Sequence, residues 1–186
     1  MLLIERFGRM ARSDQHAEGM KPAQWEALRF LSKANRLSRN PGSLAEFLSS
    51  TRGTVSQTLI ALEKKGLIIR ESNPMDKRGR SLALTESGQA AIDRHPIQHL
   101  EKALSAIENG AEVARELKGV MATLAKQRDM AVFGICGECA HLQKAKGEKK
   151  EDEPHHCLWS NTPLTDLNLA LICREFASVE ESRPQG

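Results

Sequence analysis

The fold is decided by residues 43–66, SLAEFLSSTRGTVSQTLIALEKKG. Ser43 and Glu46 have the spacing of a capping box, in which each side chain accepts from the other residue's backbone N–H, and they predict the start of a short helix. After a brief turn, the Thr51 hydroxyl is placed to cap a second helix, which Gly66 ends. Two short capped helices joined by so brief a turn, with a strand directly after them, predict a helix-turn-helix.

Residues on both sides extend this motif into a winged helix. Upstream, apolar residues at helical spacing predict helices over residues 1–16 and from Pro22 onward, and Asn40-Pro41-Gly42 is interpreted as the stop after the second of them. Downstream, the β-favouring residues at 67–71 and the polar–apolar alternation at 81–85 predict a β-hairpin with a long charged tip. The predicted fold class is therefore mainly α with a small β-hairpin wing.

Two apolar seams at helical spacing follow the hairpin, after a helix that Thr85 is expected to cap. The first seam consists of Ile97, Leu100, Leu104 and Ile107, and the second consists of Val113, Leu117, Val120 and Leu124. Together with the N-terminal helix, they present more apolar surface than one small winged domain needs. We therefore expect a helical association surface in this part of the chain.

The helix at 52–65 has the composition of a helix that enters the major groove of DNA. If Val55, Leu59 and Leu62 form its buried stripe, the outward side is small, polar and lightly charged, which lets a helix approach base edges closely. Gln57 is suited to pair with adenine, and Ile60 to contact a thymine methyl. The predicted DNA-contact residues of this helix are Arg52, Thr54, Ser56, Gln57, Ile60 and Lys64.

The hairpin tip supplies a second set of DNA-contact candidates, the bases Lys77, Arg78 and Arg80 around the single acid Asp76. An arginine there can enter a narrow minor groove while Asp76 holds a guanidinium in position. Between residues 52 and 80, seven Lys and Arg stand against three Asp and Glu, whereas the net charge of the whole chain is only +3. The basic charge is therefore concentrated where DNA would lie.

With these features in place, residues 1–127 resemble the MarR family of bacterial winged-helix regulators. The strings that support the resemblance are MKPAQW at 20–25, SLAEFL at 43–48, TVSQTL at 54–59, LEKKGLIIR at 62–70 and NPMDKRGR at 73–80 followed by LALTESG at 82–88. The resemblance implies a homodimer, held by helices from both ends of the domain, that binds a pseudo-palindromic operator in double-stranded DNA and usually represses. It also assigns DNA contact to the 52–65 helix and to Asp76 and Arg78.

All four cysteines, Cys136, Cys139, Cys157 and Cys173, lie in the remaining part of the chain. The C-x₂-C spacing lets one tight turn present two thiolates to a single ion. In a reducing compartment, clustered cysteines indicate metal or redox chemistry before structural disulfides. We expect Gly134 and Gly137 to let the backbone approach the ion, and a short helix within residues 165–176 to bring Cys173 back to it.

Four thiolates complete either a zinc site or an iron–sulfur cluster. A zinc ribbon usually shows two C-x₂-C knuckles, and the single knuckle here favours the cluster slightly, although His155 or His156 could also serve zinc. A thiol–disulfide switch without metal is the third alternative. Phe133, Trp159 and Phe176 are expected to shield the site or to form its small core. A segment with so few apolar groups is expected to need a metal in order to fold.

The sequence therefore predicts a DNA-binding and dimerisation domain at 1–127 and a cysteine module at 128–186. No apolar run is long enough to cross a membrane, the start lacks the pattern of a secretory signal, and no catalytic motif is present, so we expect a cytoplasmic regulator that is not an enzyme. We hypothesise that the metal centre senses iron, oxygen or redox state by shifting against the helices at 97–124. The alternatives are a regulator with a purely structural zinc site, and a small metalloprotein that handles electrons or docks a protein partner.

Overall fold

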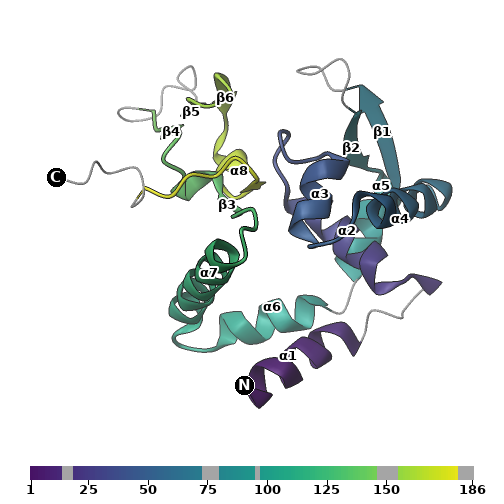
Figure 1. Cartoon of the computed structure of the whole chain (residues 1–186), viewed down its shortest axis with the longest axis horizontal. Coiled ribbons are helices and arrows are strands. Elements are labelled where there is room, and N and C mark those ends of the chain that lie inside the picture. Colours follow the sequence, from purple (N-terminus) through teal and green to yellow (C-terminus); the bar gives the residue numbers. More distant parts are fainter. Residues whose placement is uncertain (14–18, 73–79, 95–96, 146–154, 180–186) are drawn as a thin grey trace.

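The computed structural model of the chain describes residues 1–13, 19–72, 80–94, 97–145 and 155–179 (Figure 1). The elements of its first half are α1 Leu2–Ser13, α2 Pro22–Lys33, α3 Pro41–Phe47, α4 Arg52–Lys64, β1 Ile68–Ser72, β2 Arg80–Leu84 and α5 Glu86–Arg94. The elements that follow are α6 Ile97–Ala106, α7 Gly110–Gln127, β3 Gly134–Ile135, the short 3₁₀ helix η2 Cys136–Glu138, β4 Leu142–Gln143, β5 His155–Cys157, β6 Thr162–Leu164, α8 Asp166–Leu169 and β7 Ile172–Cys173.

The main hydrophobic core lies around α2. Trp25 and Leu28 of α2 pack in one buried cluster with Leu44 of α3 and with Leu59 and Leu62 of α4. Each of these side chains is at most 1% exposed, so their burial supplies a large share of the apolar free energy that holds the domain together. This core fixes α4 on the outside of the domain with one face inward.

The wing is the antiparallel pair of β1 and β2, in register from Ile68 opposite Leu84 to Ser72 opposite Arg80. Gly66 ends α4 with φ +67°, a left-handed conformation that glycine adopts without steric cost. The Thr85 hydroxyl accepts from the Gly88 N–H at 3.0 Å and donates to the Gly66 carbonyl at 2.7 Å. The predicted hairpin, helix stop and Thr85 cap are thus confirmed.

The start of α3 differs from the sequence prediction, which made Ser43 the cap. The helix begins three residues earlier, at Pro41, and Asn40 is its N-cap. The Asn40 Oδ1 accepts from the Ser43 N–H at 2.9 Å, while its Nδ2 donates to the Leu37 carbonyl and to the Ser43 hydroxyl. The prediction was wrong because Asn is as good a cap as Ser and Pro41 is favoured in the first helical turn, so Asn40-Pro41 starts a helix here rather than stopping the chain.

The helices α1, α6 and α7 extend away from the packed helices α2 to α5 (Figure 1). No residue of α7 is buried, and its apolar side chains Val113, Leu117, Val120, Met121 and Leu124 are all exposed. On α1, the side chains of Leu2, Leu3, Ile4, Phe7 and Met10 are exposed as well. Within the described ranges, no helix combines the length and apolar character that a membrane span requires.

The C-terminal region is built from very short strands. β3 pairs antiparallel with β7, and β5 lies between β4 and β6 in a second small sheet. The helix predicted within 165–176 is confined to α8, and Ile172 lies instead in β7 opposite Ile135. The spacing of Leu167, Leu171 and Ile172 was misleading because the last of these is a β-branched residue that pairs across a sheet.

Candidate nucleic-acid interface and cysteine cluster

The orientation of α4 follows from its cap and its buried face. The Thr51 Oγ1 accepts from the Thr54 N–H at 3.2 Å, as the sequence predicts. Val55, Leu59 and Leu62 are each at most 1% exposed, which confirms the predicted inward stripe. The remaining surface of the helix is thereby left to solvent.

The predicted DNA-contact residues of α4 lie on this solvent side. The side chains of Arg52, Thr54, Ser56, Gln57 and Lys64 are exposed, and Ile60 is half-buried. Two of the hydroxyls have intrahelical partners, because Thr54 shares a hydrogen bond with Thr51 and Thr58 donates to the Thr54 carbonyl. The exposed face of α4 is therefore small enough to enter a major groove. It presents the Gln57 amide, the Ser56 hydroxyl and the basic groups of Arg52 and Lys64.

The wing lies beside the C-terminal end of α4. The Arg70 guanidinium of β1 forms an ion pair with the Glu63 carboxylate of α4 at 3.2 Å, so the strand and the helix are tied together. The predicted tip residues Asp76, Lys77 and Arg78 lie outside the described residues. Arg80 is the first residue of β2, and its side chain is also outside the described part.

The four cysteines are brought together by the short strands. Cys173 lies opposite Gly134 in the β3–β7 pair, and Cys157 lies opposite Leu142 in the β4–β5 pair. Cys136 and Cys139 flank the turn of η2, where the Cys139 N–H donates to the Cys136 carbonyl at 3.2 Å. All four side chains line one cavity of about 200 Å³. Cys136 and Cys173 are buried, and the other two are half-buried.

The buried pair is joined by a hydrogen bond from the Cys173 thiol. This bond lowers the pKa of the Cys136 thiol to about 7, with burial acting in the opposite direction, because it stabilises the Cys136 thiolate. The same bond, together with burial, raises the pKa of the Cys173 thiol. The Asn35 Nδ2 also donates to the Cys136 Sγ at 3.4 Å. Cys136 is therefore the cysteine best prepared to act as a thiolate.

The donor set of four cysteine thiols fits a thiophilic metal centre in its chemistry. Within the described ranges, no three His, Cys, Asp or Glu side chains converge closely enough to form a ready metal-binding group. The cavity that the four cysteines help to line also borders Asn35, Trp159 and Pro163, and it has room for several water molecules.

His155, a possible zinc ligand from its position, has both ring nitrogens in use. Its Nδ1 accepts from the Ala145 N–H at 3.1 Å, and its Nε2 lies 3.0 Å from the Asp166 carboxylate. The accepting Nδ1 places the proton on Nε2, where it is donated to Asp166. His155 thus holds β5 against α8 rather than facing the cysteines, whereas His141, which the sequence did not single out, lines the cavity.

The aromatic side chains that were expected to shield the cysteines are distributed differently. Trp159 lines the cavity. Phe133 instead packs edge-on against Phe47, at 5.2 Å between ring centroids, and against Phe30 of the winged-helix core. Phe133 therefore anchors the start of the cysteine module to the first domain.

The two glycines also have packing roles that the sequence did not reveal. A Cβ added at Gly134 would lie within 2.6 Å of the Phe176 ring, and one added at Gly137 would meet the Leu169 carbonyl at 3.0 Å. Gly134 and Gly137 thus make room for protein groups. Phe176 packs on the backbone of β3, next to the cysteine turn.

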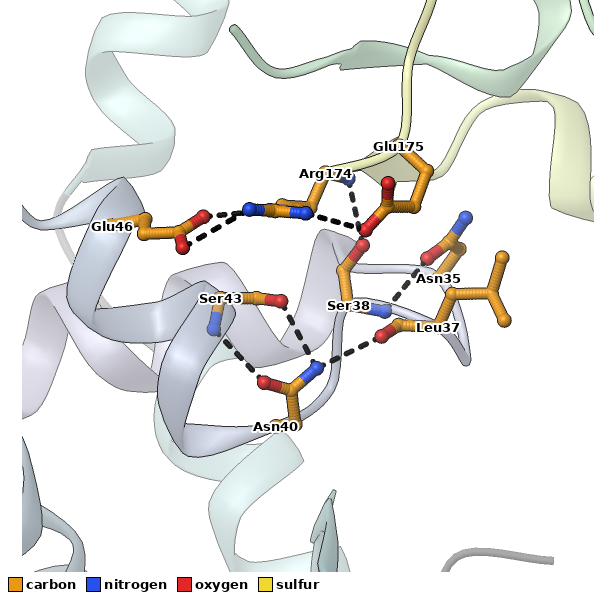
Figure 2. Close-up of polar contacts among 8 residues, drawn as sticks. All are labelled: Asn35, Leu37, Ser38, Asn40, Ser43, Glu46, Arg174 and Glu175. Atoms are coloured by element: carbon orange, nitrogen blue, oxygen red, sulfur yellow. Dashed lines mark hydrogen bonds and ion pairs between the residues drawn. The ribbon is translucent and has the colours of Figure 1, made fainter. Parts of the chain in front are cut away.

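A polar contact between the cysteine module and the helix-turn-helix was not predicted at all (Figure 2). The Arg174 guanidinium binds both carboxylate oxygens of Glu46 on α3, at 2.7 and 3.2 Å. The Arg174 N–H donates to the Ser38 hydroxyl at 2.9 Å. Glu46 therefore has the role of an ion-pair partner rather than the capping role that the sequence predicted. These pairs are 128 and 136 residues apart in sequence, so no local pattern indicates them.

The fold and the exposed helix α4 place this protein in the class of winged-helix proteins. Residues 18–79 match the model of the MarR family. The chain is 31% identical over 91 residues to a proposed transcriptional regulatory protein for the hcr operon of Thauera aromatica, and 25% identical over 99 residues to the HTH-type transcriptional repressor YetL of Bacillus subtilis. These segments are 49% and 53% of this chain, and they span only 54% and 59% of the relatives.

Solved structures agree on the fold. The S. aureus MepR–DNA complex superposes with a TM-score of 0.52 at 22% identity, covering 66% of this chain and 95% of MepR. A MarR transcriptional regulator from Methanosarcina mazei Go1 gives a TM-score of 0.52 at 20% identity, covering 68% and 94%. The solved structures thus show a winged-helix fold, and the similarity to the MarR family model is confined to residues 18–79.

Proposed function

We propose that this protein is a transcriptional repressor that binds a pseudo-palindromic operator in double-stranded DNA as a homodimer. The observation that carries the proposal is the solvent-facing side of α4, where Arg52, Ser56 and Gln57 are exposed above a fully buried stripe. A helix held in this way by its own core can enter a major groove without rearrangement. The repressor function of YetL and the DNA complex of MepR support the same reading for this chain.

The homodimer is supported by the apolar surface that one chain leaves uncovered. On α7, Val113, Leu117 and Leu124 are 37%, 45% and 43% exposed, and they lie along one seam. On α1, a further apolar set from Leu2 to Met10 is exposed. Contiguous apolar surface of this kind marks a protein interface, and a second copy offers an equal surface. Two copies would then present two α4 helices to one duplex, about one helical turn apart.

The DNA proposal is tested by fluorescence anisotropy with a duplex selected from a randomised library by the full-length protein. We expect Gln57→Ala to weaken binding by about 1–3 kcal/mol and to relax sequence preference, because an amide that reads a base is lost. We expect Arg52→Ala to weaken binding to all sequences and to reduce the salt dependence. The matched control is Gln143→Ala, since Gln143 is an exposed amide on β4 in the cysteine module.

If no duplex is enriched, or if Gln57→Ala and Gln143→Ala have the same affinity as the wild type, α4 does not read DNA. If Arg52→Ala leaves the salt slope unchanged, Arg52 makes no phosphate contact.

We further propose that the four cysteines hold one metal centre, an iron–sulfur cluster or a zinc ion, and that its state alters DNA affinity. The proposal is supported by four sulfurs around one cavity and by the engagement of both His155 nitrogens elsewhere. A bound centre would cross-link the short strands of the cysteine module, and a cluster would in addition supply redox chemistry.

Metal analysis and a visible spectrum of anaerobically purified protein distinguish the two centres. A broad band near ~400 nm with bound iron indicates the cluster, and one zinc per chain without colour indicates the zinc site. A variant with all four cysteines replaced by alanine should bind neither. If this variant keeps wild-type DNA affinity with and without air, the centre has only a structural role.

A further inference from the structure

The cysteine cluster is connected to the helix-turn-helix of its own chain through the segment between α2 and α3, residues 34–40. Asn35 is 8% exposed and makes contacts in both directions. Its Nδ2 donates to the Cys136 Sγ at 3.4 Å, and its backbone N–H donates to the Ile172 carbonyl, next to Cys173, at 2.8 Å. Its Oδ1 accepts from the Ser38 N–H at 3.0 Å and closes the turn. One buried amide thus links the sulfur site to the 34–40 segment.

A second connection runs through Arg174, the residue after Cys173 (Figure 2). Its backbone N–H donates to the hydroxyl of Ser38, which is fully buried. Its guanidinium forms the two-point ion pair with Glu46 on α3 and a further ion pair with Glu175 at 2.8 Å. Two-point arginine–carboxylate pairs fix orientation as well as distance. The position of Cys173 is therefore tied to α3 by a short chain of directed bonds.

Residues 34–40 also position α4 and the wing, the two elements that we expect to contact DNA. Asn40 caps α3, which packs against α4. The Arg39 carbonyl accepts from the Leu82 N–H of β2 at 2.8 Å, so the segment is also bonded to the wing. A displacement of residues 34–40 therefore reaches α3 and the wing without passing through α6 or α7.

The contact of the cysteine module with α7 is much weaker by comparison. It includes the ion pair of Lys118 and Glu138 at 3.0 Å, in which both side chains are more than half exposed. The Lys118 ammonium contacts both carboxylate oxygens of Glu138, but a pair this exposed contributes little, because solvent screens it and both side chains lose freedom. The buried contacts lie on the side of the helix-turn-helix, and not on the side of the helix that we expect to form the dimer.

We propose that residues 34–40 couple the cysteine centre to the helix-turn-helix within one chain, so that loading of the centre tightens DNA binding. This inference rests on the proposed function. In the described part of the module the only buried side chains are Cys136 and Cys173, so without the centre the module has little to hold it in place. When the centre is loaded, the module is ordered and its bonds to Asn35, Ser38 and Glu46 hold α3 and the wing in position. When the centre is stripped, these bonds are released. DNA binding must then order residues 34–40 again, and this loss of conformational entropy weakens the affinity.

The test compares DNA affinity of the loaded and stripped full-length protein, reconstituted anaerobically either with Zn²⁺ alone or with ferrous iron and sulfide. For the wild type we expect loading to tighten binding of the selected duplex by about fivefold or more, within the usual range of coupling between sites. Glu46→Gln should weaken DNA binding by the loaded form by about 1.5- to 5-fold. This factor corresponds to the free energy that an ion pair of this exposure contributes. The same variant should leave the stripped form unchanged, because the pair is already broken there.

Two further variants test whether the coupling runs through residues 34–40 and not through α7. Asn35→Ala should remove the coupling, so that the loaded and stripped forms bind the duplex equally, because the bond to sulfur and the turn are both lost. Lys118→Gln is the matched control, since it removes the ion pair with α7 and leaves the cysteine turn unaltered. Metal content is measured for every variant, so that a change in loading is distinguished from a change in coupling.

A readout without DNA separates failure of this inference from failure of the proposed function. The N–H groups of Asn35 and Arg174 both donate across the contact, so stripping should raise their hydrogen exchange while the buried core of α2 stays protected. Equal affinity of the loaded and stripped wild type would overturn the coupling and leave the DNA proposal intact. Loss of coupling in Lys118→Gln but not in Glu46→Gln would overturn the route. If no duplex is selected, hydrogen exchange alone tests the coupling. Equal exchange of the Asn35 and Arg174 N–H groups in the loaded and stripped protein would overturn it.

Discussion

Replacing Asn40 by alanine should destabilise the protein by about 2–3 kcal/mol. The cap bond to the Ser43 N–H is worth about 1 kcal/mol. The two bonds from the Asn40 Nδ2, to the Leu37 carbonyl and the Ser43 hydroxyl, add about 0.5–1 kcal/mol each. Ser43 is 6% exposed, so water does not readily replace the lost partner.

The matched change is Ser43→Ala, which separates the observed cap from the one that the sequence favours. In the structure, Ser43 lies inside α3, so alanine loses one hydrogen bond of about 1 kcal/mol and regains about 0.5 kcal/mol in helix propensity. We therefore expect Ser43→Ala to cost about 0.5 kcal/mol, some 2 kcal/mol less than Asn40→Ala.

Urea unfolding at a fixed protein concentration measures both variants, with circular dichroism as the probe. Fixed concentration is needed because dimer formation would make the stability depend on it. In thermal unfolding, the Asn40→Ala variant should melt about 4–12 °C lower than the wild type. The reasoning is refuted if Ser43→Ala is as destabilising as Asn40→Ala, because Ser43 would then be the cap.

Three further predictions follow from other parts of the molecule. Leu117→Asp on α7 should give monomers in sedimentation velocity and about tenfold or greater loss of DNA affinity, and persistent dimers would place the interface elsewhere. Gly134→Ala should expose the cysteine module to limited proteolysis while the winged helix stays intact, because the added Cβ meets the Phe176 ring; wild-type resistance would show that the ring moves aside. Leu59→Ala should lower the free energy of unfolding by about 2–5 kcal/mol in a urea titration, since Leu59 is fully buried, and a cost below about 1 kcal/mol would contradict the assigned core.

The winged helix was predictable because its signals are local. The Thr51 cap, the Gly66 stop and the period of Val55, Leu59 and Leu62 act within a few residues, and the structure confirms each of them. The start of α3 was predicted wrongly because two adequate caps stand three residues apart, and only the geometry decides between them. The hairpin strands were predicted nearly to the residue, because β-favouring residues mark the first strand and polar–apolar alternation marks the second.

The cysteine module was only partly predictable, because its structure depends on contacts between distant residues. The spacing of Cys136 and Cys139 indicated the tight turn that η2 forms. The contact of Asn35 with Cys136 spans 101 residues, and that of Arg174 with Glu46 spans 128, so neither has a periodic or local signature. A buried Asn outside any helix is a weak signal, since Asn is usually found in exposed turns. For this reason the sequence pointed to α6 and α7 as the partner of the module, whereas the buried contacts are with residues 34–40.

The most direct measurement of the central claim is the mass of the complex between the full-length protein and a selected duplex, by sedimentation equilibrium. Two chains on one duplex, with binding that weakens steeply as salt is added, are expected if two α4 helices occupy successive major-groove faces. A single chain per duplex, or no complex with any selected duplex, would contradict the account.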